Sequence, residues 1–230
     1  TKLTTVQQDD KELMKILLMV SRIQYFIATF ILLGFILVGR QFVMRWAGDE
    51  YEVSYYIAIL VMGPQLISII QALFATLLEA MNKHRVKSMI YLGVAILNLV
   101  LTLILVKPYG VIGCAIATAI GMLINALFNN VYYNYKLKLE MKFYWIQLLK
   151  LFPVTLIIFI IGAIIVQIMN PVSYIGIGLF CVCFSIIYII LIWLFSLNEE
   201  EKNVVINLLS KYSVLKNLVL QKWLNTKIGS

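Results

Sequence analysis

The sequence predicts an all-α protein of the polytopic membrane class, a bundle of six transmembrane helices. The chain has 230 residues, of which 62% are hydrophobic and only 13% charged, whereas a soluble domain carries roughly a quarter charged residues. The second observation is that the apolar residues form six charge-free runs: 23–39, 53–78, 88–106, 108–135, 151–169 and 172–197. Because a helix needs about 20 residues to cross about 30 Å of hydrocarbon, these runs predict six spans.

The individual runs predict where helices extend and where they break. The first run has only 17 residues, so its helix is expected to continue past Arg22 or Arg40. Pro64 and Pro153 lie within the second and fifth runs, and each should kink or break its helix because proline lacks the backbone donor. Aromatic residues at the end of run four and before run five are expected to anchor at the membrane interface: Tyr132, Tyr133, Tyr135, Phe143, Tyr144 and Trp145.

The loop charges predict the orientation of the spans. One side carries the basic residues Lys11, Lys15, Arg22, Lys83, Arg85, Lys87, Lys136, Lys138 and Lys142. The other side carries an acidic loop with Arg40 and Arg45, then Lys107 alone, then an uncharged Asn-Pro turn. The positive-inside rule therefore places both termini in the cytoplasm.

The chain divides into three parts by composition. Residues 1–16 form a polar leader without the features of a signal peptide, and we expect a cut from a longer chain, with an upstream helix missing. Residues 17–197 form the transmembrane part. Residues 198–230 begin with an acidic turn suited to a helix N-terminus and continue as an amphipathic tail, on the membrane surface or docked on the protein.

Arg22 and Arg40 are candidates for binding a negatively charged substrate. They are 18 residues apart, so a continuous helix places them on one face, at opposite ends. A guanidinium suits a pyrophosphate because it can hold two oxygens at once. The alternative is that each arginine reaches toward the headgroups on its own side of the membrane. Arg45 follows the same helix and is expected to form a loop ion pair with the nearby acidic residues.

The second run carries polar residues that suit a sugar-lined cavity. Positions 64, 68, 71, 75 and 79 share one helix face, which includes Ser68 and Gln71, and Gln65 lies beside it. Hydrogen bonding between helices is the alternative, worth about 0.6 kcal/mol on average. Glu79 is a candidate for cation coupling, although an ion pair with Lys83 at i+4 is the simpler interpretation.

Two asparagines complete the candidate cavity residues. Asn98 lies near the middle of the third run, where its amide needs a partner. Asn125 ends a ridge of small residues in the fourth run at i+4 spacing, made with Gly113, Ala117 and Gly121. Such ridges allow close approach of helix backbones in lipid, so this one predicts helix packing.

The sequence shows no catalytic residues, metal ligands or cofactor motif, and it favours a protein that is not an enzyme. The three cysteines fit no zinc or redox spacing, and His84 is the sole histidine. The net charge of +8 comes from basic residues between apolar runs. That pattern predicts contact with anionic membrane lipids and argues against binding to nucleic acid.

Residues 98–120 carry a family resemblance. The run Asn98-Leu-Val-Leu-Thr-Leu-Ile-Leu-Val-Lys-Pro-Tyr-Gly-Val-Ile-Gly-Cys-Ala-Ile-Ala-Thr-Ala-Ile120 resembles the C-terminal lobe of the polysaccharide transporters. Residues 2–10 and 48–51 resemble other segments of that lobe. The family belongs to the multidrug/oligosaccharidyl-lipid/polysaccharide exporter superfamily, whose members have two lobes.

The resemblance implies a flippase of the O-antigen type in the bacterial inner membrane. It would move a lipid-linked (polyprenyl-pyrophosphate) oligosaccharide by alternating access, for polysaccharide or lipopolysaccharide biosynthesis, and its partner would be the missing N-terminal lobe. Arg22 and Arg40 match the cationic cavity of the family. The alternatives are a cation-coupled multidrug exporter of the same fold and, from another class, a membrane-embedded glycosyltransferase or polymerase.

Overall fold

The protein is helical throughout the part of the chain that the structure describes. The computed structural model describes residues 2–81, 84–204 and 206–207, and the side chains among them except those of residues 2–11 and 84. Its elements are α1 (Lys2–Ala47), η1 (Asp49–Tyr51), α2 (Glu52–Ile70), α3 (Ala72–Ala80), α4 (His84–Lys136), α5 (Met141–Leu149), α6 (Phe152–Met169) and α7 (Tyr174–Phe195). The predicted all-α class is therefore confirmed for this part of the chain.

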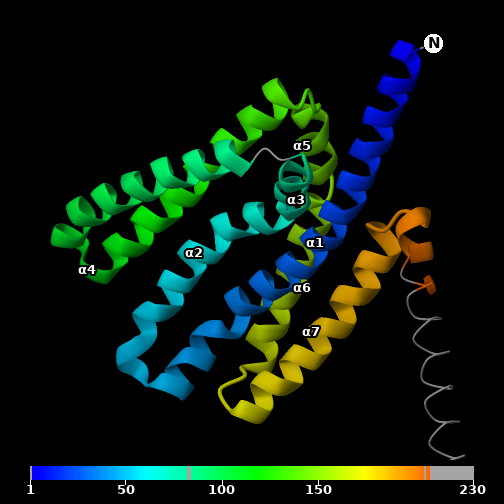
Figure 1. Ribbon diagram of the computed structural model, residues 1–230. Coiled ribbons are helices and arrows are strands. Elements are labelled where there is room, and N and C mark those ends of the chain that lie inside the picture. Colours follow the sequence, from blue (N-terminus) through cyan, green and yellow to red (C-terminus); the bar gives the residue numbers. More distant parts are fainter. Residues whose placement is uncertain (1, 82–83, 205, 208–230) are drawn as a thin grey trace, which may run out of the picture.

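Within the described residues, five helical segments are long and apolar enough to cross a membrane: Glu12–Ala47, Asp49–Ile70, Arg85–Lys136, Met141–Met169 and Tyr174–Phe195. The third of these contains two of the six predicted spans, because α4 folds back on itself at Gly110 (Figure 1). Gly110 has φ 57° and ψ −134°, a conformation open to glycine and costly for residues with a Cβ. The described chain is thus an all-α polytopic bundle, and its third and fourth predicted spans are the two limbs of the α4 hairpin.

The predicted ridge of small residues holds the α4 hairpin together. A Cβ added at Gly113 would lie 2.1 Å from the carbonyl oxygen of Leu105, and one at Gly121 would lie 3.5 Å from the Cβ of Asn98. Ala117, between these glycines, is completely buried. The two limbs therefore run antiparallel in close contact, as the ridge predicts.

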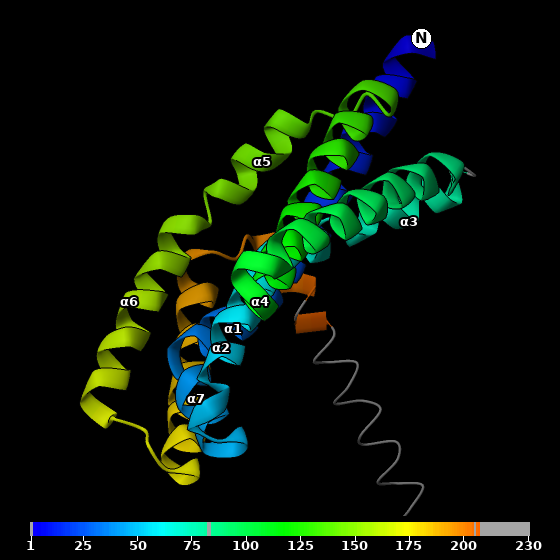
Figure 2. The same cartoon turned by 90° about the vertical axis from the view of Figure 1, so that its left-hand side faces the viewer.

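α1 is the central helix of the bundle. It runs for 46 residues, through both Arg22 and Arg40, so the prediction that the first span extends beyond its apolar run is confirmed. It packs against α2, α3, α5, α6 and α7, while the α4 hairpin packs mainly on α2 at the edge of the bundle (Figures 1 and 2).

The helix breaks agree with one of the two predicted proline positions. α5 and α6 are separated at Lys150 and Leu151, directly before Pro153, which occupies the first turn of α6. Proline is tolerated there because the first backbone N–H groups of a helix have no helical partner. α2 instead continues past Pro64, and the chain breaks only at Gln71, between α2 and α3.

Two predicted interfacial aromatic residues lie in the core instead. Tyr133 is 3% exposed and Tyr144 is completely buried, both in contact with Phe74 of α3. The Tyr144 hydroxyl donates to Ser21 Oγ (3.0 Å) of α1. Tyr133 and Tyr144 were predicted at the membrane interface because they lie at the ends of apolar runs. The packing of the helices instead encloses both side chains. Tyr135, by contrast, is 75% exposed.

The helix ends form two groups at opposite ends of the bundle. The α1–α2 and α6–α7 connections lie at the lower end of the bundle in both views, and the α4–α5 connection lies at the upper end (Figures 1 and 2). Lys136 is the last residue of α4 and Lys142 lies in the first turn of α5, so both flank the α4–α5 connection.

Candidate functional site

The two candidate arginines lie on one continuous helix, near opposite ends of its apolar part. Arg22 is half-buried at the start of the charge-free stretch of α1, and Arg40 is exposed at the end of that stretch. Each is engaged with a glutamate from elsewhere in the chain. The structure therefore gives each arginine an anionic partner of its own.

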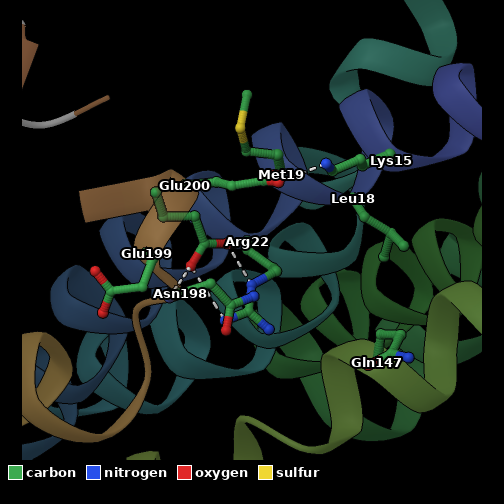
Figure 3. Close-up of a pocket in the computed structure, with 9 residues that line it drawn as sticks. Lys15, Leu18, Met19, Arg22, Gln147, Asn198, Glu199 and Glu200 are labelled. Atoms are coloured by element: carbon green, nitrogen blue, oxygen red, sulfur yellow. Dashed lines mark hydrogen bonds and ion pairs between the residues drawn. The ribbon is translucent and has the colours of Figure 1, made fainter. Parts of the chain in front are cut away.

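Arg22 is bound by the segment that follows α7. Its Nε and Nη2 both donate to the Glu201 carboxylate (Figure 3). Nη2 also donates to the carbonyl oxygen of Ser196 (2.5 Å). The Arg22 side chain is only 11% exposed and that of Glu201 only 3%. A buried, two-pronged ion pair of this kind is costly to break, because either charge left alone would be uncompensated.

The local sequence explains why Glu201 is in this position. Residues 199–204 are helical, and the Glu201 carboxylate accepts a hydrogen bond from the backbone N–H of Asn198 (2.9 Å). This bond is one half of a capping box, in which the third residue of a helix accepts from the backbone N–H of the residue that precedes the helix. The predicted acidic N-terminus of a helix is confirmed here, whereas residues 208–230 of the predicted tail lie outside the described residues.

A charged pocket surrounds the Arg22 pair. It has a volume of about 420 Å³ and lies between α1, α5 and the segment after α7 (Figure 3). Lys15 contributes a second cation about two helical turns before Arg22, and its Nζ lies 2.5 Å from Glu200 Oε1. Gln147 of α5 lines the pocket from the other side. The pocket therefore combines two cations of α1 with the acidic residues that neutralise them.

Arg40 lies in a different environment at the other end of α1. Its Nε donates to Glu52 Oε1 (2.7 Å), and the Tyr56 hydroxyl donates to the same oxygen (3.3 Å). Arg45 was expected to form an ion pair in the loop. Its guanidinium carbon instead lies over the ring of Tyr174, 5.3 Å from the ring centroid. Solvent screens an exposed pair such as that of Arg40, so this arginine is readily released.

Gln71 belongs to a buried amide cluster at the break between α2 and α3. Its Nε2 donates to Asn130 Oδ1 (2.9 Å), which also accepts from Trp145 Nε1 (2.8 Å). The last α2 carbonyls are satisfied by side chains too, since Tyr144 donates to Ile70 O (3.3 Å). This cluster connects α2, α4 and α5 and is the hydrogen bonding between helices that the sequence left as an alternative.

The remaining candidates are spread over α2, α3 and α4. Gln65 is exposed and Ser68 is half-buried on α2. Asn98 accepts from Thr102 Oγ1 (3.3 Å) within its own limb of α4, and Asn125 is buried, with its carbonyl oxygen accepting from Asn129 (2.9 Å). The structure does not gather these residues around Arg22, and a role in a substrate cavity stays a prediction.

Glu79 forms an ion pair with Lys87 across the connection between α3 and α4. Lys87 Nζ lies 2.7 Å from Glu79 Oε1, and the predicted partner Lys83 lies outside the described residues. Among the described residues there is no group of three histidine, cysteine or acidic side chains that could hold a metal ion.

Sequence reasoning missed the partners that come from distant parts of the chain. Glu201 follows Arg22 by 179 residues. A hydroxyl network was missed as well: Tyr188 of α7 donates to Phe26 O (2.7 Å) and contacts Thr29 Oγ1 (2.8 Å). Tyr25 contacts Thr155 of α6 (3.0 Å) in the same region. The available signal was a set of hydroxyl side chains within apolar runs, which need partners in lipid.

These features define a multi-pass α-helical membrane protein with charged residues held in pairs on its central helix. Part of the chain is similar to a protein of Haloferax volcanii named "Probable low-salt glycan biosynthesis flippase Agl15". The two are 26% identical over 85 residues, which are 37% of this chain and 18% of that protein's length. The matched stretch is thus a minor part of the relative. No protein-family model matches the chain, and no solved structure matches it.

Proposed function

We propose that this protein is a flippase for lipid-linked oligosaccharides. It moves a polyprenyl-pyrophosphate-linked glycan across the cytoplasmic membrane for polysaccharide biosynthesis, by alternating access. The observation that carries the proposal is the similarity to the probable glycan biosynthesis flippase of Haloferax volcanii, in a chain whose described part has five helices apolar and long enough to cross the membrane. A bacterial inner membrane and an O-antigen type of substrate belong to the same proposal and follow from the family resemblance of residues 98–120.

The cations of α1 supply the chemistry that such a substrate needs. A pyrophosphate crossing a bilayer must exchange its water for other donors, because an unpaired charge in hydrocarbon is costly. Arg22 and Arg40 present guanidinium groups at the two ends of the apolar part of one helix. In this proposal they receive the pyrophosphate at the two sides of the membrane, while polar side chains such as the Gln65 amide and the Ser68 hydroxyl on α2 contact the sugars.

The proposed arrangement includes further partners. A second lobe completes the cavity, and the basic end of the bundle faces the cytoplasm and its anionic lipids. The competing exporter function would call for an embedded carboxylate as its coupling site. Glu79 is the candidate for that role, and its ion pair with Lys87 favours a structural task at the end of α3.

The test replaces Arg22 or Arg40 by Ala in the full-length protein. We expect surface glycan to fall and lipid-linked precursor to accumulate, by about tenfold or more for Arg22→Ala, since lost charge-assisted hydrogen bonds are worth about 1.5–3 kcal/mol. Precursor is measured by mass spectrometry of extracted lipids, with protein level followed in parallel.

Arg45→Ala is the matched control. Arg45 is the third arginine of α1, lies in its last turn and packs over the ring of Tyr174. Normal export by both the Arg22 and the Arg40 variant, at normal protein level, would refute the role of these arginines.

A further inference from the structure

The Arg22 pocket contains its own carboxylate ligand. Glu201 binds Arg22 through the same two-oxygen geometry that a phosphate group uses with a guanidinium. It is not a neighbour in sequence, since 179 residues separate the two. The segment after α7 thereby supplies an anion to a cation of the central helix, at the point where the proposed substrate would need that cation.

Ion pairs and a charge-assisted hydrogen bond attach the segment after α7 to α1. Glu201 and the Ser196 carbonyl oxygen bind Arg22, and Glu200 binds Lys15 across a distance of 2.5 Å. The pocket of about 420 Å³ beside these pairs gives a headgroup room to approach. An anion of higher charge than a carboxylate can therefore compete for both cations at once.

We infer that residues 198–204 form an acidic latch that closes on α1 and is released by a diphosphate. In the closed state Glu201 occupies Arg22, and a diphosphate headgroup entering the pocket displaces it and takes Lys15 as a second partner. This inference rests on the proposed function for the identity of the ligand, and it adds regulation: the segment after α7 leaves α1 when substrate arrives.

The latch can be tested by measuring the affinity for diphosphate. Diphosphate binding and latch opening are linked equilibria. If diphosphate shifts the equilibrium toward the open latch, a variant without the latch carboxylate must bind diphosphate more tightly. Glu201→Gln keeps the shape and an oxygen for the Asn198 cap while removing the charge that competes. Glu199→Gln is the matched control, because Glu199 lies in the same turn but pairs with Lys202 within the segment (2.9 Å).

The experiment uses the 230-residue chain in phosphatidylcholine nanodiscs, with its three cysteines replaced by Ala. Spin labels are placed through Ile16→Cys on α1 and Asn203→Cys in the latch, both of which are exposed positions. Inorganic pyrophosphate and farnesyl pyrophosphate are added separately, and the label distance and the binding affinity are measured.

We expect either probe to lengthen the distance, and a response to farnesyl pyrophosphate alone would assign the site to a lipid-borne headgroup. Glu201→Gln should be open without a probe and bind it at least about fivefold more tightly than Glu199→Gln, at the lower end of typical coupling factors. Absence of binding by both probes, binding without a change in distance, or equal affinity of the two variants would each overturn the latch.

The latch and the proposed function can fail separately. The distance and affinity measurements need no transport, whereas the export test with Arg22→Ala needs no latch. Normal export by the arginine variants together with a diphosphate-released latch would leave the latch in place and remove the substrate role. Impaired export with a latch that does not respond to diphosphate would support the substrate role of the arginines and refute the latch.

Discussion

At the scale of single residues, glycines determine how closely the helices pack. Gly162 of α6 lies against two other helices: a Cβ added there would be 2.5 Å from Leu37 Cδ1 of α1 and 3.0 Å from Phe184 Cε2 of α7. Gly178 on α7 has no atom within 4 Å of the same added Cβ. The two glycines therefore differ in packing while sharing an apolar helical environment.

We predict that Gly162→Ala lowers the free energy of unfolding by about 1–3 kcal/mol, the usual cost of overpacking. Gly178→Ala should leave stability unchanged or raise it slightly, because alanine favours the helix. Both variants are compared by thermal unfolding in the same detergent. Equal stability of the two would show that α1 and α7 separate without cost at this position.

At the scale of elements, the α4 hairpin depends on one backbone conformation. Its two limbs reverse direction at Gly110, with φ 57° and ψ −134°, and they touch through Gly113 and Gly121. Pro108 fixes the backbone just before the turn. The sequence predicted both the break between the third and fourth runs and the ridge of small residues, because each depends on residues close to one another in the chain.

We predict that Gly110→Ala destabilises the hairpin by about 1–3 kcal/mol through backbone strain. Gly93→Ala is the control, since Gly93 lies in the same hairpin with no atom within 4 Å of an added Cβ. Protease sensitivity of the 107–110 turn in nanodiscs reports the effect. A turn that stays as resistant in Gly110→Ala as in Gly93→Ala would contradict the assignment.

At the scale of the whole molecule, the connections between helices alternate between two ends of the bundle (Figures 1 and 2). Glu50 in η1 and Glu140 before α5 are both exposed and lie in connections of opposite ends. Glu140 is surrounded by lysines, whereas Glu50 belongs to the acidic loop. The positive-inside rule then assigns Glu140 to the cytoplasm.

We predict that Glu140→Cys, in a variant whose native cysteines are replaced by Ala, reacts with an impermeant maleimide only after the membrane is opened. Glu50→Cys should react in intact cells. Labelling is measured by the mass shift of the protein. The reverse pattern would invert the orientation, and labelling of both sites from outside would contradict the alternation.

The sequence by itself determined the membrane class, the helical spans, the α4 turn, the break before Pro153 and the acidic helix start after α7. These features depend on hydropathy and on residues a few positions apart, which the chain displays directly. The helix of the first run also extends beyond that run, through both Arg22 and Arg40, as the shortness of the run predicted.

Only the tertiary structure decided which groups meet. It placed Glu201 on Arg22 and Asn130 on Gln71, moved the α2 break from Pro64 to Gln71, and buried Tyr133 and Tyr144. The physical reason is that polar groups in a low-dielectric bundle take whichever partner helix packing brings within reach. That partner can be 179 residues away, as it is for Arg22, and no local pattern encodes such a distance.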